Sequence, residues 1–362
     1  MTKSTLMSLR ALKTFSIKTP MKNLKHLRYL DCSYSDISAL PEATTMLYSL
    51  QTLRLIGCKY LKKLLEGMSH MSSLRHIFLM GCALLVRMPQ GIGQLNSLQT
   101  LTSYVIDGDV GHGIDQLKDL NLGGALCLNE LRKVRSAEIA KQGNMSAKHN
   151  LKQLSLDWYG PDSRFVGYEV DTNAEGILED LRPHKRLEVL LLSNYTGAKL
   201  SSWMHNPTLL EHLSELQLNN CKNCKDLPPL WQLPSLGYLC LQSLDSLTSI
   251  CIGNDDTGIG QYNISPPPFF PKLEIMILED MPNLERWHEE VAGQVSVVSF
   301  PQLKKLIISE CPRLKTLPKG LLQQLPALEE LSIIGCRNLK GAFSRGGAYW
   351  KLVKRIPKRF VG

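Results

Sequence analysis

The sequence lacks several features that would assign a protein to a common class. It has no run of 18 or more apolar residues, so we expect no membrane-spanning helix. Its first 20 residues lack the continuous apolar core of a signal peptide, and sequons at Asn144, Asn194 and Asn263 are interpreted as chance matches. Ten cysteines in 362 residues are too few for a disulfide scaffold. We therefore expect a soluble, cytoplasmic protein.

Acidic residues are missing from both ends of the chain. Residues 1–30 contain seven Lys or Arg and no Asp or Glu, and residues 340–362 contain seven more without an acid. The rest of the chain carries 28 basic and 33 acidic residues. Because a nucleic-acid reader is expected to carry a basic stripe on its body, we expect no nucleic-acid partner. The basic ends favour solvated flanks or a protein contact.

What the sequence does contain is one leucine frame, repeated. LIISECPRLKTLP at 306–318 has counterparts LRLIGCKYLKKL at 53–64, IFLMGCALLVRMP at 77–89 and LQLNNCKNCKDLP at 216–228. They share the frame LxxLxLxxC followed by xxLxxLP. The first anchoring leucines, at 27, 50, 74 and 98, are 23, 24 and 24 residues apart. This period and its Asn/Cys position are those of leucine-rich repeats.

Each repeat predicts a short strand followed by an irregular return. The two leucines of LxL point to one face of the strand, and stacked neighbours bury that face and pair their strands in parallel. We therefore expect an α/β solenoid, a leucine-rich-repeat horseshoe with a short-stranded parallel β-sheet on its concave face. Irregular or short helical segments would form the convex side.

The repeats are expected to fill most of the chain. We place eleven to twelve irregular repeats in residues 1–340, with no dividing linker, and a basic cap or tail in residues 341–362. Polar, Gly- or Pro-rich loop insertions interrupt the frame near 105–120, 160–176, 252–270 and 288–299. Residues 136–150 predict a short helix.

Cysteine recurs at one position of the repeat, the turn that follows the strand. A small side chain with a weak polar atom suits a turn whose backbone groups lack regular partners. We therefore predict a structural role for the slot cysteines, which are Cys58, Cys82, Cys221, Cys311 and Cys336. Other repeats fill the same slot with Ser35, Tyr159, Tyr195, Leu244 and Met281.

Motifs for catalysis and metal binding are not found. Cys221 and Cys224 form a CxxC, but no second CxxC or His pair accompanies it, and Cys221 already occupies a repeat slot. The glycines of DGDVGHG and the HEEV at 288–291 match no complete nucleotide or zinc motif. We predict no enzyme activity, no catalytic residues, no metal and no cofactor.

A solenoid commonly binds partners on its concave face, through the residues that alternate with the inward leucines. The candidate partner-binding residues are Tyr29, Asp31, Arg54, His76, Phe78, Tyr104, Asp157, Glu215, Gln217, Tyr238, Lys305 and Glu330. Among these we single out Phe78 and Tyr104, because exposed aromatic residues on adjacent strands can anchor a partner. The alternative is a mixed solvent face on which no single residue is special.

The repeats resemble the leucine-rich-repeat region of plant intracellular disease-resistance proteins, the coiled-coil nucleotide-binding class. The segments that carry the resemblance are LKHLRYLD (24–31), MPQGIGQLNSLQTL (88–101), NLGGALCLNELRKV (121–134), LKQLSLDW (151–158), LRPHKRLEVLLLSNYTGAKLSSWM (181–204), LPPLWQLPSL (227–236), FPKLEIMILEDMPNLERW (270–287), FPQLKKLIISECPRLKTLP (300–318) and GGAYWKLVKRIP (346–357). Trp231 and Ser201 depart from the family pattern, which usually has Gly and Pro there. No GxxxxGK[ST] phosphate loop occurs, so the nucleotide-binding domain of the family is missing from this sequence.

The resemblance implies a sensor module of plant innate immunity. Such a module would bind a pathogen effector or a guarded host protein, and it would hold a nucleotide-binding switch inactive, within one chain or in trans. One alternative is a substrate adaptor of a ubiquitin ligase, which would need an F-box-like segment before the repeats. Another is a truncated, non-signalling decoy.

Overall fold

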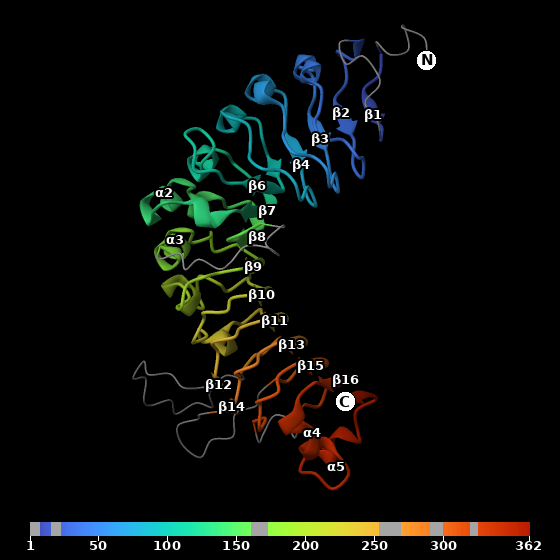
Figure 1. Cartoon of the computed structure of the whole chain (residues 1–362), viewed down its shortest axis with the longest axis vertical. Helices are drawn as coiled ribbons and strands as arrows, with labels where there is room; N and C mark the ends of the chain where they lie inside the picture. The colour runs from blue at the N-terminus through green and yellow to red at the C-terminus, as the bar shows by residue number, and fades with distance from the viewer. Residues whose placement is uncertain (1–7, 16–22, 161–172, 253–268, 290–299, 319–324) are drawn as a thin grey trace. The chain divides into compact units, whose positions relative to one another are not determined.

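The computed structural model describes residues 8–15, 23–160, 173–252, 269–289, 300–318 and 325–362 (Figure 1). The chain divides into two compact units, Met1–His184 and Lys185–Gly362. In each, short parallel strands are stacked side by side, and return segments with short helices connect them. The predicted leucine-rich-repeat solenoid is therefore confirmed. The extent of the repeat domain, residues 1–340, stays a prediction.

The first unit contains two sets of strands. Strands β1 (Ala11–Lys13), β2 (Tyr29–Asp31), β3 (Thr52–Arg54), β4 (His76–Phe78) and β5 (Thr100–Leu101) pair in sequence order. Strands β6 (Ser103–Val105), β7 (Gly124–Asn129) and β8 (Leu151–Asp157) follow, again parallel. The helices in the described part of this unit are α2 (Ala137–Gln142) and α3 (Ala174–Asp180), with short 3-10 turns between most strands. In Figure 1, α2 and α3 lie side by side, away from the strands.

The second unit contains one longer parallel ladder and a two-stranded pair. The ladder is β9 (Val189–Ser193), β10 (Glu215–Asn219), β11 (Tyr238–Gln242), β13 (Ile275–Glu279), β15 (Lys305–Ser309), β16 (Glu330–Ile334) and β17 (Lys358–Val361). The pair is β12 (Ser249–Ile252) and β14 (Arg286–Glu289). Helices α4 (Arg337–Phe343) and α5 (Trp350–Val353) precede β17. The segment predicted as a basic cap or tail thus supplies the last strand of the ladder.

The leucines of the frame form the core of each unit. Leu53, Leu216 and Leu306 have no solvent exposure, and each lies beside the equivalent leucine of a neighbouring strand. Fully burying such a side chain contributes roughly 1.5–3 kcal/mol. A few buried leucines per repeat are therefore enough to hold neighbouring repeats together.

A left-handed residue precedes the slot in most described repeats, a regularity that the leucine frame does not reveal. In the first unit it is Tyr34, Gly57 and Gly81; in the second it is Asn194, Asn220, Ser243, Asp280, Glu310 and Gly335. In seven of these nine residues the backbone N–H donates to a carbonyl of the next repeat, for example from Gly57 to Met80 at 2.7 Å and from Glu310 to Ile334 at 2.9 Å. The reversed φ turns the chain away from the strand while keeping this inter-repeat bond.

The helix predicted in residues 136–150 is confirmed as α2. Ser136 lies at its N-cap, and the Ser136 hydroxyl accepts a hydrogen bond from the Ile139 N–H at 3.4 Å. Of the predicted insertions, 105–120 is described in full and contains the 3-10 helix Ile114–Leu117. Most of the insertions at 160–176, 252–270 and 288–299 lies outside the described residues.

Tyr104 contradicts the predicted frame. We expected it on the concave face, but it has 0% exposure, and its hydroxyl donates to the Gly113 carbonyl at 2.6 Å. The strand breaks between β5 and β6, and Thr102 turns inward, where its hydroxyl accepts from the Leu79 N–H at 2.9 Å. Because successive side chains of a strand alternate between faces, this one-residue shift reverses the rest of the strand. Tyr104 consequently occupies the inward position opposite Leu128.

Candidate protein-recognition surface

The candidate surface is the face of the strands that the leucines leave uncovered, called the sheet face below. Apart from Tyr104, each predicted partner-binding residue lies at a sheet-face position of its strand. Asp31 is buried there by its neighbours, whereas the others are partly exposed. The units are described separately.

In the first unit, strand pairing brings five predicted residues together, and we call them the Arg54 cluster: Tyr29, Asp31, Arg54, His76 and Phe78. Register places Asp31, Arg54 and Phe78 side by side on three consecutive strands. The Arg54 Nε lies 3.8 Å from Asp31 Oδ2, and its guanidinium carbon lies 4.7 Å from the centre of the Phe78 ring. The His76 ring stacks near Phe78, with 6.4 Å between ring centres.

The Asp31 carboxylate of the Arg54 cluster stays negatively charged. Burial alone would raise the pKa of Asp31, but hydrogen bonding from Ser33 and the charges of Arg54 and Lys13 outweigh it, so the pKa lies below its ordinary value. The Ser33 N–H donates to Asp31 Oδ1 at 2.9 Å. Asp31 is therefore ionised at neutral pH, and it holds the guanidinium against the aromatic ring.

The sheet face changes character further along the first unit. On β6, β7 and β8 it presents Ser103, Cys127 and Ser155 side by side. The Asn129 amide donates to the Ser103 hydroxyl at 2.9 Å. Asp157, a predicted binding residue, ends β8, and its carboxylate accepts from the Tyr159 N–H at 3.2 Å. These small polar groups form hydrogen bonds but present no large anchor to a partner.

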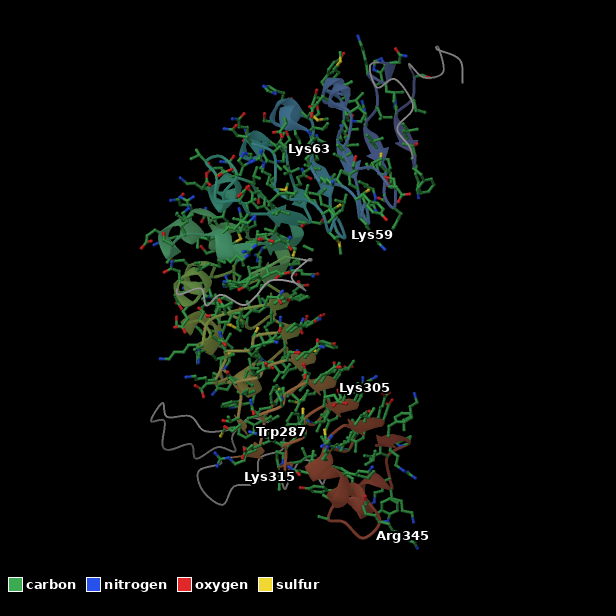
Figure 2. The ribbon with its side chains drawn as sticks, in the orientation of Figure 1. Lys59, Lys63, Trp287, Lys305, Lys315 and Arg345 are labelled. Atoms are coloured by element: carbon green, nitrogen blue, oxygen red, sulfur yellow. The ribbon has the colours of Figure 1, made fainter. Side chains whose placement is uncertain are left out.

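In the second unit the sheet face is a ladder of aligned rows. The first row runs from Glu215 through Tyr238 to Lys305 and Glu330, all of them predicted. Lys305 and Glu330 form an ion pair of 2.8 Å, and Figure 2 shows Lys305 on the strand side of this unit. On β10, the Gln217 amide donates to Glu215 at 2.6 Å. Most of these charges are therefore held by neighbours.

The rows also contain aliphatic and aromatic residues that the candidate set omitted. Ile275 lies in the first row, Ile277 and Ile307 in the second, and Ile334 and Phe360 at the C-terminal end. Ile334 is 46% and Phe360 59% exposed. The three isoleucines of β13 and β15 and Ile334 alternate with inward residues of the frame, so the sequence contained the signal. Phe360 lay in the segment predicted as a cap or tail, where the frame is absent.

The slot cysteines lie in the core, where their thiols face backbone carbonyls. The Cys58 thiol donates to the Cys32 carbonyl at 3.1 Å and the Cys82 thiol to the Leu55 carbonyl at 3.0 Å, each crossing to the preceding repeat. Burial raises the pKa of Cys82 to about 12. A buried, protonated thiol is a poor nucleophile, so these contacts suit a structural role.

The CxxC also lies in the core. Cys221 and Cys224 are both buried, and the Cys224 thiol donates to the Asp226 carbonyl at 3.5 Å. Within the described ranges, no group of three or more His, Cys, Asp or Glu side chains is arranged to hold a metal ion. The helices of those same ranges are all too short or too polar to cross a bilayer.

Two family models match the chain: R13L1/DRL21 leucine-rich repeats over residues 114–244, and plant disease resistance protein RPS2-like leucine-rich repeats over residues 186–343. A putative disease resistance protein of Arabidopsis thaliana, At3g14460, is 36% identical over 98% of this chain. The putative disease resistance RPP13-like protein 1, from the same plant, is 34% identical over 87% of the chain. The chain is a leucine-rich-repeat region of the plant disease-resistance family.

The match covers only part of those relatives. The chain spans 24% of the length of the first Arabidopsis protein and 30% of the second. Among solved structures, the Leptospira interrogans leucine-rich-repeat protein LIC12759 aligns with 96% of this chain and 99% of its own, at 18% identity and a TM-score of 0.35. Strands β9 to β16 fall inside the residues that the RPS2-like model matches.

Proposed function

We propose that this chain is the protein-recognition module of a plant immune receptor, and that the sheet face binds a pathogen effector or a guarded host protein. Membership of the disease-resistance family supports the biological setting. In the same proposal, the module holds the nucleotide-binding switch of the receptor inactive as long as no partner is bound to the sheet face.

The observation that carries the proposal is the Arg54 cluster. Phe78 is partly exposed, and Arg54 is fixed between its ring and the ionised Asp31. Aromatic residues and arginines dominate binding energy at protein interfaces. Because both side chains are already held in place, little conformational entropy is lost when a partner binds.

The test is a pull-down from leaf extract of the plant that encodes the chain, with the full chain as bait. Combining Arg54→Glu with Phe78→Ala removes both anchors, and we expect retention of the specific partner to fall at least tenfold, because truncating a hot spot costs about 2 kcal/mol or more. Tyr104 is left intact because it is buried.

The matched control combines Met46→Ser with Tyr48→Ser. Both residues are exposed, but they lie at the 3-10 helix Glu42–Met46 and the turn after it, outside the sheet face. We expect this control to retain the partner as the unmodified chain does. A partner lost equally from both variants, or from neither, contradicts the proposed site.

A further inference from the structure

A second surface of the first unit combines exposed apolar side chains with lysines. It is formed by the turns that follow β2, β3 and β4, and we call it the turn surface: Tyr34, Tyr60, Met80, Leu84 and Val86, with Lys59 and Lys62 between them. The five apolar side chains are all exposed, from 38% for Leu84 to 72% for Tyr34. In Figure 2, Lys59 lies at the outer end of its turn and points away from the ribbon.

Backbone hydrogen bonds place these residues beside one another. The Tyr34 N–H donates to the Ile56 carbonyl at 2.7 Å, and the Gly57 N–H donates to the Met80 carbonyl at 2.7 Å. Further along the turns, the Lys62 backbone N–H donates to the Ser38 carbonyl, and the Val86 backbone N–H donates to the Lys62 carbonyl at 3.2 Å. The turn surface is thus one strip across three consecutive repeats.

Glycine at the left-handed positions keeps this strip open. Gly57 has a φ of +68°, and a Cβ there would lie 2.6 Å from the Tyr34 ring. The ring therefore lies directly over the Gly57 backbone, while most of its surface remains in solvent. The Tyr34 ring packs on backbone with one side and is available for contact with another surface on the other.

The N-terminal part of the chain, which includes the turn surface, carries its excess of positive charge. Residues 1–106 contain 13 Lys or Arg and four Asp or Glu, whereas residues 107–362 contain 29 of each. The first 106 residues therefore account for the net charge of +9, of which residues 1–30 contribute seven and residues 31–106, which include the turn surface, contribute two. Next to the turn surface, Arg87 pairs with Asp109 at 3.5 Å, while the described contacts include no ion pair for Lys59 or Lys62.

We propose that the turn surface docks this unit onto an anionic phospholipid membrane. Exposed tyrosine and aliphatic tips can enter the headgroup region, and lysines near the surface are attracted by anionic lipids. Lysine is depleted at protein–protein interfaces, so its position between the apolar tips favours lipid over a protein partner. This contact is peripheral and needs no spanning helix.

The experiment is vesicle flotation of the full chain, with phosphatidylcholine vesicles and with equimolar phosphatidylcholine and phosphatidylserine vesicles. We expect binding to the mixed vesicles and little to phosphatidylcholine alone. Replacing Lys59 and Lys62 by Gln should weaken the partitioning about 30-fold, since each lysine near an anionic surface contributes about fivefold. Combining Tyr60→Ser with Leu84→Ser should weaken it about tenfold.

Controls separate this surface from the sheet face and from misfolding. The Met46→Ser and Tyr48→Ser pair removes exposed apolar residues elsewhere in the unit and should leave flotation unchanged. Thermal unfolding of each turn-surface variant should match that of the unmodified chain, because the altered side chains are exposed. These variants should also retain the partner captured through Arg54 and Phe78.

Two outcomes overturn the proposal. One is the absence of flotation with the mixed vesicles. The other is flotation that the Lys59, Lys62 and Tyr60, Leu84 variants leave unchanged. If those variants instead abolish capture of an acidic protein without affecting vesicle binding, the surface is a protein interface and the membrane proposal is wrong.

Discussion

The two units have the same kind of buried core but differ in the residues on their surfaces. In both, buried leucines alternate along parallel strands. Outside, the first unit presents the Arg54 cluster on strands of three residues, whereas the second presents rows of aliphatic and paired charged residues on strands mostly of five. The left-handed residues before the slots also differ in type: the first unit has Tyr34, Gly57 and Gly81, and the second has Asn194, Asn220, Ser243, Asp280, Glu310 and Gly335. The buried frame constrains the core positions and leaves the outer positions free to vary.

The comparison separates two kinds of residue that a repeat contains. Inward positions must be apolar because one repeat cannot bury its own face without its neighbours. Sheet-face and turn positions have no such requirement, so their chemistry can be selected for partners. Differences between the units at these outer positions are therefore more informative about function than the leucines they share.

The largest expected effect tests whether the units depend on the same buried frame. Leu306→Asp places a carboxylate at a fully buried position of β15, and we expect a loss of at least about 4 kcal/mol in the free energy of unfolding of its repeats. Limited proteolysis with mass spectrometry should show new cleavage near residues 300–318. Unchanged protection there would contradict the frame.

Leu53→Asp is the counterpart in the first unit, since Leu53 is equally buried. It should open the repeats around β3 and leave the peptides of β13 and β15 protected. If either substitution exposes both units to the same extent, the two compact units unfold as one.

The next largest effect distinguishes Tyr104 from Phe78, the two aromatic residues that were both predicted to lie exposed on the concave face. Tyr104→Ala removes a fully buried ring and should lower the free energy of unfolding by about 3–5 kcal/mol. Phe78→Ala removes a partly exposed ring and should cost about 1 kcal/mol or less. Urea unfolding of both variants measures the difference. Equal losses would mean that the shift between β5 and β6 does not reverse the strand.

A smaller effect concerns a buried charge of the first unit that has no described counterpart in the second. Lys148 is 2% exposed, and its ammonium group donates to the carbonyls of Leu117 at 2.7 Å and Leu120 at 2.9 Å. Burial lowers its pKa to about 8. Because the folded pKa lies below the unfolded value, the unfolded chain binds more protons between pH 8 and 10.5, and stability should rise with pH across this window.

The matching variant is Lys148→Met, which keeps the length of the side chain and removes its titration. We expect the free energy of unfolding of the unmodified chain, relative to that of this variant, to increase by about 2–3 kcal/mol from pH 7 to pH 10.5. Urea unfolding at both pH values measures it. A difference that stays constant with pH would show that Lys148 does not titrate in this window.

The smallest effect tests the turns. Glu310 has a φ of +51°, so Glu310→Gly should raise the free energy of unfolding by about 0.5–1 kcal/mol. Gly57→Ala, the reverse change in the first unit, should lower it by about 1 kcal/mol, because a Cβ would lie 2.6 Å from the Tyr34 ring. Thermal unfolding distinguishes the signs. A destabilised Glu310→Gly would show that the glutamate side chain contributes more than its backbone strain costs.

The fold followed from the sequence because its signal is periodic. Leucine spacing predicted the parallel strands, and residues 136–150 were predicted to contain the short helix that forms α2. Tyr104 was predicted on the wrong face, because the one-residue shift at Thr102 leaves no mark in a leucine pattern. The left-handed turns were also hidden, since Tyr34, Ser243 and Glu310 are not residues that favour positive φ.

The candidate surface was predicted in part. Alternation along the strands placed Asp31, Arg54 and Phe78 on one face, but only register showed that they contact one another. Ile334 was missed because the candidate set contains only charged, polar and aromatic residues of the frame. Phe360 was missed because its strand, β17, lies beyond the predicted repeats. Contacts between strands depend on three-dimensional register, which the spacing of the repeats constrains only approximately.

The most direct test of the recognition surface is site-specific photocrosslinking in plant cells. A photoreactive phenylalanine analogue replaces Phe78 on the sheet face or, as a control, the exposed Tyr48 beside the 3-10 helix Glu42–Met46. The proposed function predicts a discrete protein adduct from position 78 and none from position 48. An adduct from position 48 alone, or the same adducts from both positions, would contradict it.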